Sequence, residues 1–123
     1  MENCVFCDIL HNKTYAFEND LAVAFADIMP ASPGHHLIIP KRHCRIYFDL
    51  TPEEIEAMFE LSKVVKEYID KKHHPDGYNV GFNVEEAGGQ SVFHAHLHVI
   101  PRYHGDVEHP RGGIRKVSRL KNM

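Results

Sequence analysis

The chain has 123 residues, of which 43% are hydrophobic and 25% charged, and its formal net charge at pH 7 is −3. This length and composition predict a single globular domain with one core. No apolar run approaches the roughly 18 residues of a membrane span, and the first residues lack the apolar region of a secretion signal, so we expect a cytoplasmic protein without membrane contact. The absence of a basic surplus argues against a nucleic-acid partner.

Cys4 and Cys7 form a C-x-x-C pair near the N-terminus. Without a secretion signal, such a pair is expected to bind a metal or to act in redox chemistry rather than to form a structural disulfide. A thioredoxin-like motif would stand between a strand and a helix, whereas this pair precedes any strong strand pattern. Metal binding is therefore favoured, with histidine as the expected source of two further ligands. The alternative is that both cysteines are small buried residues without a ligand.

Alternating apolar residues and turn residues predict an antiparallel sheet of about five short strands. The patterns indicate strands at 15–17, 21–26, 36–39, 78–83 and 94–101. A long helix is expected between the third and the fourth of these strands. Thr51 is its predicted N-cap, Pro52 takes the first helical position and Glu54 can close a capping box. Apolar residues at helical spacing continue to about Lys72, which gives an α+β fold with one main helix.

Three histidines, His94, His96 and His98, alternate with apolar residues along the last predicted strand. On a strand they would share one face, and the apolar residues between them would face the core. With a rise of about 3.3 Å per residue, the first and third lie roughly 13 Å apart, which is too far for one metal to bind all three. We therefore expect the row to serve more than one task, with an imidazole nucleophile beside a second imidazole that contacts a phosphate. The alternative is a half-buried strand that happens to be rich in histidine.

The segment from Gln90 to Ile100 resembles the signature of the histidine triad (HIT) nucleotide hydrolases and transferases, in which histidines alternate with hydrophobic residues. The resemblance extends to 25–28, 34–41 and Asn83 and covers about 4–103. It implies a single HIT domain over 1–123, with 104–123 as a C-terminal extension. It also implies a homodimer whose two sheets join into one, and the wide apolar stripe of the predicted helix would serve that interface.

The end of the chain differs from the eukaryotic-type phosphoramidases of this family. No tryptophan is present, and a basic, glycine-containing tail follows 101–106, which is more similar to the bacterial and archaeal branch. We interpret the tail as a solvated or partner-contacting extension. Its basic residues are Arg111, Arg115, Lys116, Arg119 and Lys121.

The resemblance implies catalytic roles for the histidine row and for the loop before it. His96 matches the family nucleophile, which attacks the α-phosphorus and forms a nucleotidyl-histidine that water then cleaves. His98 would donate to a phosphate oxygen, and backbone N–H groups near Gly89, Gln90 and Ser91 would add further donors. The Ser91 hydroxyl would contact the phosphate or relay a proton to the leaving group.

Four further positions match the family's nucleoside site and its supporting residues. Asp27 would accept hydrogen bonds from the ribose hydroxyls, Ile28 would pack on the base and Asn83 would approach the sugar or the phosphate. His35 is expected to support the triad from behind rather than to react. The alternatives are turn-forming roles for Asp27 and Asn83, and a hydrogen-bonded histidine at a strand end for His35.

Some bacterial relatives that the chain resembles hold zinc with a cysteine pair, a histidine after the central strand and the first triad histidine. The corresponding residues here are Cys4, Cys7, His43 and His94, so a structural zinc is expected. The expected function is hydrolysis of a purine nucleotide conjugate to nucleoside monophosphate. An amine, a second nucleotide or an acyl phosphate could be the leaving group. The alternatives are a dinucleoside polyphosphate hydrolase or phosphorylase and a non-catalytic nucleotide-binding module.

Overall fold

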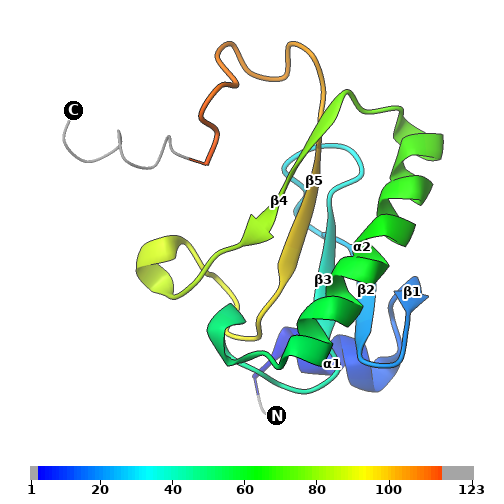
Figure 1. Ribbon diagram of the computed structural model, residues 1–123, viewed down its shortest axis with the longest axis vertical. Helices are drawn as coiled ribbons and strands as arrows, with labels where there is room; N and C mark the ends of the chain where they lie inside the picture. The colour runs from blue at the N-terminus through cyan, green and yellow to red at the C-terminus, as the bar shows by residue number, and fades with distance from the viewer. Residues whose placement is uncertain (1–2, 115–123) are drawn as a thin grey trace.

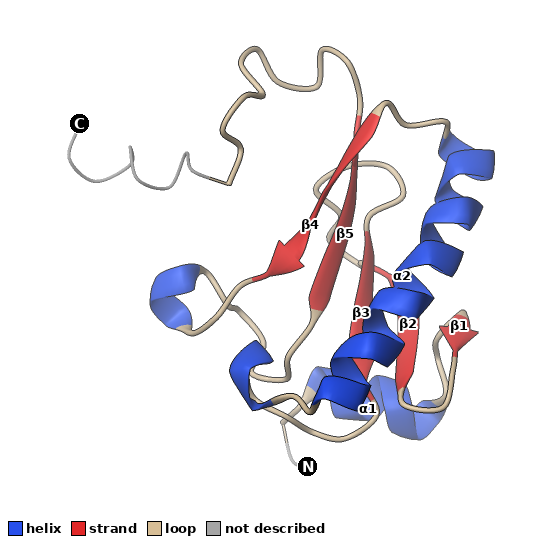
Figure 2. Cartoon of the chain, in the orientation of Figure 1, coloured by secondary structure: helices blue, strands red, loops and turns tan. Residues whose placement is uncertain are grey.

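A computed structural model describes residues 3–114 of the chain. Its centre is a five-stranded antiparallel sheet in the order β1-β2-β3-β5-β4, with β1 and β4 at the two edges (Figures 1 and 2). The strands are β1 (Phe17–Glu18), β2 (Ala22–Ala26), β3 (His36–Pro40), β4 (Gly77–Phe82) and β5 (Leu97–Arg102). The prediction of an α+β fold with about five antiparallel strands is confirmed.

The long helix α2 (Pro52–His73) lies across one face of the sheet (Figure 1). Thr51 and Glu54 form the expected capping box: the Thr51 hydroxyl accepts from the Glu54 N–H, and the Glu54 carboxylate accepts from the Thr51 N–H. These two bonds satisfy backbone donors that a helix start would otherwise leave unpaired. Helix α2 buries one apolar stripe against the sheet, formed by Met58, Leu61, Val65 and Ile69.

A second helix, α1 (Val5–Asn12), was not expected from the sequence. Eight residues are too few for a stable helix in isolation, so α1 depends on tertiary contacts. Its N-cap is Cys4, whose sulfur accepts from the Cys7 N–H at 3.3 Å, and Phe6 is its buried residue. In Figure 1 this helix lies at the lower end of the sheet. Two short 3₁₀ helices, η1 (Tyr47–Asp49) and η2 (Glu86–Gly88), complete the described helical segments.

The sheet has a separate apolar cluster on each face. The cluster under α2 includes Ala24, Ile38, Leu97 and Val99. The cluster on the other face includes Cys4, Phe6, Val23, Phe25, Leu37 and Ile39. Strands β2 and β3 contribute alternate residues to both, which is why each is apolar along its length. The face away from α2 is therefore where α1 packs.

Strand β5 begins at Leu97, three residues later than the sequence pattern indicated. At residues 94–96 the chain is not yet paired with β3, because the Ala95 N–H donates to the Cys44 carbonyl, 2.6 Å away, instead of to a neighbouring strand. Within the strand, His98 is paired with Leu37 of β3 on one side and with Gly81 of β4 on the other. The third histidine of the row thus sits in the sheet, whereas the first two precede it.

Beyond β5, residues 103–114 form turns that pass close to β4, where Gly113 approaches the Asn79 side chain. Arg111 belongs to this segment and is exposed. The other basic residues expected in the tail lie outside the described residues. They are Arg115, Lys116, Arg119 and Lys121. Within residues 3–114, neither helix combines the length and the apolar character needed to span a bilayer.

Candidate functional site

The four residues expected to bind metal come together at the start of α1. The Cys4 sulfur lies 3.5 Å from Nδ1 of His94, and the Cys7 sulfur lies 3.5 Å from the same nitrogen and 3.3 Å from Nδ1 of His43. All four atoms lie within 4.8 Å of one another. Ligand atoms of a tetrahedral site with bonds of about 2.0–2.3 Å are separated by about 3.3–3.8 Å, so the cluster has the dimensions of such a site.

The hydrogen bonds of His94 also suit a metal ligand. Its Nε2 lies 3.1 Å from the Pro40 carbonyl, to which it donates, so Nδ1 carries a lone pair directed at the cysteines. Burial lowers the pKa of His94 to about 4, which keeps the ring neutral at pH 7. Burial and the neighbouring Cys4 raise the pKa of Cys7 to about 11, so a cation would be needed to hold the thiolate there. The four residues could therefore bind a metal.

His96 is buried and has a defined tautomer. Its Nδ1–H donates to the His94 carbonyl, 2.9 Å away, which leaves a lone pair on Nε2. Burial lowers the pKa of His96 and favours the neutral ring. The ring of Phe6 packs edge-on against it, with 5.0 Å between ring centroids. Neither this carbonyl nor the contact with Phe6 could be identified from the sequence, although Phe6 stands between the two cysteines.

His98 is oriented by His35 and Asp27. Nδ1 of His35 accepts from the Ala31 N–H at 2.9 Å, so the proton of the neutral His35 ring must be on Nε2. That N–H faces Nδ1 of His98 at 3.0 Å and an Asp27 oxygen at 3.5 Å. Burial lowers the pKa of His98 to about 4 and also lowers that of His35. Because Nδ1 of His98 accepts, its own proton is on Nε2.

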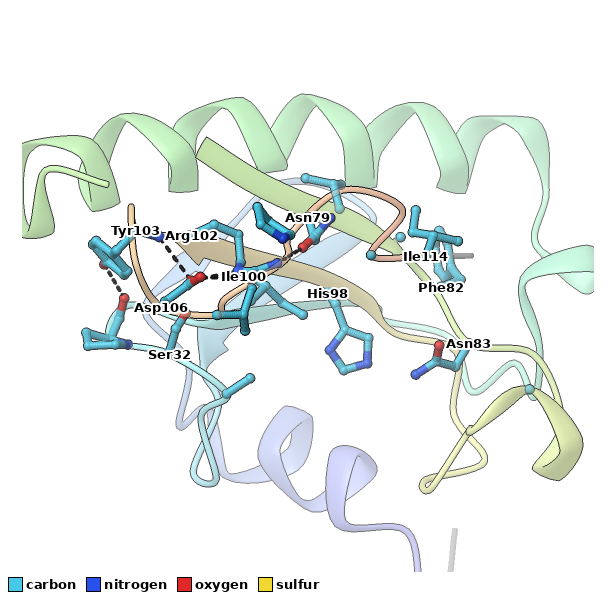
Figure 3. A pocket seen from close by; sticks show the side chains of 18 of the residues that line it. Ser32, Asn79, Phe82, Asn83, His98, Ile100, Arg102, Tyr103, Asp106 and Ile114 are labelled. Atoms are coloured by element: carbon cyan, nitrogen blue, oxygen red, sulfur yellow. Dashed lines mark hydrogen bonds and ion pairs between the residues drawn. The ribbon is translucent and has the colours of Figure 1, made fainter. Parts of the chain in front are cut away.

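This Nε2–H of His98 has no partner. Within residues 3–114 it is the one buried side-chain nitrogen or oxygen without a hydrogen bond. An unpaired buried donor costs about 1–3 kcal/mol, so it marks a place where a ligand acceptor would be stabilised. His98 lines a cavity of about 990 Å³ between β4, β5 and the segment after β5. Figure 3 shows its ring among the lining side chains, which also include the ion pair of Arg102 and Asp106 further along the cavity.

Two of the three backbone N–H groups expected to face a phosphate, those of Gly89 and Gln90, are engaged within the glycine loop. The N–H of Gly89 donates to the Glu86 carbonyl at 2.9 Å, and that of Gln90 donates to the Glu85 carbonyl at 3.0 Å. The buried Gln90 side chain is also fully engaged, since it accepts from the Glu85 N–H and donates to the carbonyls of Arg45 and Val92. In this conformation the N–H groups of Gly89 and Gln90 therefore bond within the loop, and a contact of this loop with a phosphate stays a prediction.

The remaining expected site residues are more exposed. Asn83 lines the same cavity as His98, whereas Ser91 is exposed and lines a smaller cavity of about 450 Å³ together with Cys4 and His43. The Ile28 side chain is 92% exposed, next to Asp27. Asp27 itself is held by the Met29 N–H, which donates to its Oδ1 at 2.9 Å. The structure therefore brings Asp27, His35, His96 and His98 together, whereas Ile28 is exposed beside Asp27 and Ser91 lines a separate cavity.

The fold and this site define an α+β protein with a row of neutral, oriented imidazoles beside a possible metal site. The chain belongs to the HIT domain family, whose model matches residues 11–105. An uncharacterized HIT-like protein of Methanocaldococcus jannaschii is 35% identical over 98% of this chain and 91% of its own length. An adenylylsulfatase of Arabidopsis thaliana is 35% identical over 85% of this chain and 54% of its own length. A zinc-bound histidine triad family protein from Mycobacterium smegmatis superposes with a TM-score of 0.77 at 35% identity, covering 85% of this chain and 78% of that one.

Proposed function

We propose that the protein hydrolyses a purine nucleotide conjugate at its α-phosphate and releases nucleoside monophosphate through a nucleotidyl-histidine intermediate. The observation that carries the proposal is the pairing of a lone pair on Nε2 of His96 with an unpartnered N–H on Nε2 of His98. The rings of the two residues are 4.9 Å apart between centroids. A nucleophile and a hydrogen-bond donor at this spacing suit a phosphorus centre and one of its oxygens. The name of the Arabidopsis relative also supports a hydrolase.

The reaction has two displacements at phosphorus. Nε2 of His96 uses its lone pair to form a bond to the α-phosphorus, and the bond from phosphorus to the leaving group breaks, with the electron pair departing on the leaving group. A proton then reaches the leaving group from water or from the Ser91 hydroxyl. Next, a water oxygen attacks phosphorus, the bond to Nε2 breaks and the water proton is released. The N–H of His98 donates to a non-bridging oxygen in both steps.

The nucleoside would bind between the exposed Ile28 and the carboxylate of Asp27. The oriented Oδ2 of Asp27 can accept from ribose hydroxyls, and Ile28 offers an apolar surface for the base. Asn83 would meet the sugar or the phosphate from the cavity that His98 also lines. His35 would hold His98 in the donating tautomer without contacting the substrate.

We further propose that Cys4, Cys7, His43 and His94 hold a structural zinc ion. The donor set of two thiolates and two imidazoles is one that zinc prefers, and the four atoms leave no room for a substrate ligand. The zinc-bound relative from Mycobacterium smegmatis supports this choice of metal. Bound there, the ion would tie the start of α1 to the segment that precedes β5.

We also propose a homodimer in which two sheets join along β4. This strand is one of the two sheet edges and has six residues, whereas β1 at the other edge has two. Its Val80 side chain is 44% exposed. A long, partly apolar edge is a surface that proteins cover by pairing. Light scattering at increasing concentration tests this proposal, and a mass that stays at 14.1 kDa would contradict it.

The decisive experiment compares the wild type with His96→Ala on an adenosine phosphoramidate, following AMP release and the intact mass of the protein. We expect release and a transient one-nucleotide adduct in the wild type, and a loss of about a thousandfold or more in the variant. His36→Ala is the matched control, because it removes a buried histidine on the opposite face of the sheet.

Three outcomes would redirect the proposal. If the wild type releases AMP without forming an adduct, and His96→Ala still releases AMP, the covalent route is refuted. If the wild type is inactive on the phosphoramidate but cleaves a dinucleoside polyphosphate, the leaving group is a nucleotide. If neither compound is turned over although AMP binds, the protein is a nucleotide-binding module.

A further inference from the structure

The four candidate metal ligands are connected in two ways to His96, the candidate nucleophile. The first is through the backbone: His94 directs its side chain at the cysteines, while its carbonyl accepts the Nδ1–H of His96. One residue thus lies in the metal site and also fixes the tautomer of the neighbouring imidazole. A shift of His94 would move both groups, since the carbonyl and the ring belong to the same residue.

The second route is through α1. Cys4 caps this helix and Cys7 lies in its first turn, so the metal site fixes the helix start. Phe6, between them, is 6% exposed and is the residue that α1 buries. Its ring lies edge-on to the His96 ring, with 5.0 Å between the ring centroids. It also packs edge-on against His94 and Phe25, at centroid distances of 6.0 and 5.5 Å. Phe6 therefore packs against one side of the buried His96 ring.

We propose that Phe6 is a positioning residue for His96, acting together with the His94 carbonyl, and that Cys4, Cys7, His43 and His94 hold both contacts in place. The assignment of His96 as nucleophile rests on the proposed function, whereas the contacts themselves do not. An edge-on aromatic contact restricts rotation of the imidazole, and the hydrogen bond fixes which nitrogen is unprotonated. A nucleophile aligned in this way reacts faster, because misplacement by about 1 Å can cost as much as a hundredfold in rate.

The chain contains a matched control for this arrangement. His36 is a buried histidine on the face covered by α2, and its Nδ1–H donates to the Gly34 carbonyl at 2.6 Å. The ring of Phe17 lies edge-on to it at 6.2 Å. His36 thus has the same two kinds of contact as His96, but neither of its partners is a metal-ligand candidate. Loosening of the whole fold would affect both histidines, whereas the proposed effect is confined to His96.

The test follows ring N–H signals in ¹⁵N-histidine-labelled full-length protein that is loaded with zinc. Signals are assigned with His96→Gln and His36→Gln. We expect Phe6→Leu, or removal of zinc with a chelator, to speed hydrogen exchange at Nδ1 of His96 about tenfold and to leave His36 unchanged. Phe17→Leu should do the reverse. In Phe6→Leu, kcat on an adenosine phosphoramidate should fall about tenfold while the affinity for AMP stays within about twofold.

Three results would overturn the proposal. The first is an unchanged His96 signal in both Phe6→Leu and chelated protein. The second is loss of the His96 and His36 signals together, which would mean that Phe6 and the metal site merely stabilise the fold. The third is weaker AMP binding in Phe6→Leu with an unchanged kcat, which would make Phe6 a nucleotide contact. The exchange measurement needs no turnover, so failure of the proposed function would be recognised separately, from His96→Ala.

Discussion

Two clusters of ligand-type side chains lie at opposite ends of the histidine row, one around His94 and one around His98. The first joins Cys4, Cys7, His43 and His94, and the second joins Asp27, His35 and His98. In both, the candidate ligand atoms lie within 4.8 Å of one another, so distances alone would allow a metal in either. Their hydrogen bonds separate them. Nε2 of His94 donates to a carbonyl and leaves Nδ1 free, whereas Nδ1 of His35 accepts from the Ala31 N–H and keeps a proton on Nε2.

The second cluster is consequently a hydrogen-bonded chain and not a metal site. To bind a cation through Nε2, the His35 ring would have to carry its proton on Nδ1. That proton would then clash with the Ala31 N–H, which points at the same nitrogen. The proton on Nε2 of His35 instead faces Nδ1 of His98 and the Asp27 carboxylate, and this contact fixes the His98 tautomer. The comparison shows that the backbone groups behind a histidine decide whether it can bind a metal or only orients a neighbouring group.

The largest expected effect comes from breaking the first cluster. If the proposed zinc ion is bound, Cys4→Ser should reduce the zinc content from one ion per chain to nearly none and lower Tm by about 10 °C or more, because the ion would tie α1 to the sheet only in the folded state. Elemental analysis and calorimetry measure both effects. Cys44→Ser is the matched control, since Cys44 is buried but lies outside the cluster. Equal zinc content in Cys4→Ser and the wild type would contradict the assignment.

The second cluster should appear in the pH dependence of stability, where a His98 variant separates its contribution from that of His94, whose pKa burial also lowers to about 4. The pKa of His98 is about 4 in the folded protein and about 6.5 when unfolded, so the unfolded chain binds the extra proton between these values. Above pH 6.5 His98 is neutral in both states and does not reduce the free energy of unfolding. As the pH falls from 6.5 toward 4, protonation of the unfolded chain lowers that free energy by at most about 3 kcal/mol. Urea unfolding at several pH values measures the slope. His98→Asn should be less acid-sensitive than the wild type, and identical slopes would argue against a neutral buried His98.

A smaller effect is expected from His35→Ala, which removes the donor that fixes the His98 tautomer. The proton of His98 can then move to Nδ1, so fewer molecules present an N–H to the phosphate, and kcat should fall about tenfold. His35→Gln should recover part of the rate, because its amide can donate to Nδ1 of His98. Steady-state kinetics decide the question. A kcat equal to that of the wild type in His35→Ala would show that His98 does not need this partner.

The smallest effect on metal content is expected from Asp27→Asn. Because the His35 tautomer keeps a metal out of the second cluster, this variant should hold as much zinc as the wild type, for which we expect one ion per chain. Its affinity for AMP should fall about fivefold, since an amide accepts ribose hydrogen bonds less strongly than a carboxylate. Metal analysis and isothermal calorimetry test both points. A second ion that binds to the wild type and is lost in Asp27→Asn would overturn the distinction between the two clusters.

The sequence predicted the regular elements well where local chemistry is strong. The capping box of Thr51 and Glu54 indicated the start of α2, and the alternation of apolar residues indicated the strands. It did not predict α1, because a helix of eight residues gains its stability from the burial of Phe6 and from contacts made 80 to 90 residues away, such as those with His94. The late start of β5 has a similar origin, in the bond from Ala95 to Cys44.

The candidate site also has features that the sequence predicted and features that only the tertiary structure decided. Residue types and their spacing in the sequence were sufficient to select His94, His96, His98 and the cysteine pair as candidates, since nucleophiles and ligands are defined by their side chains. The tertiary structure alone decided which nitrogen of each ring carries the proton, because the carbonyls of Pro40 and His94 and the N–H of Ala31 come from other parts of the chain or depend on its local path. It also decided that the N–H groups of Gly89 and Gln90 bond within their own loop. Backbone groups are the same in every residue, so only their positions in the fold could reveal these partners.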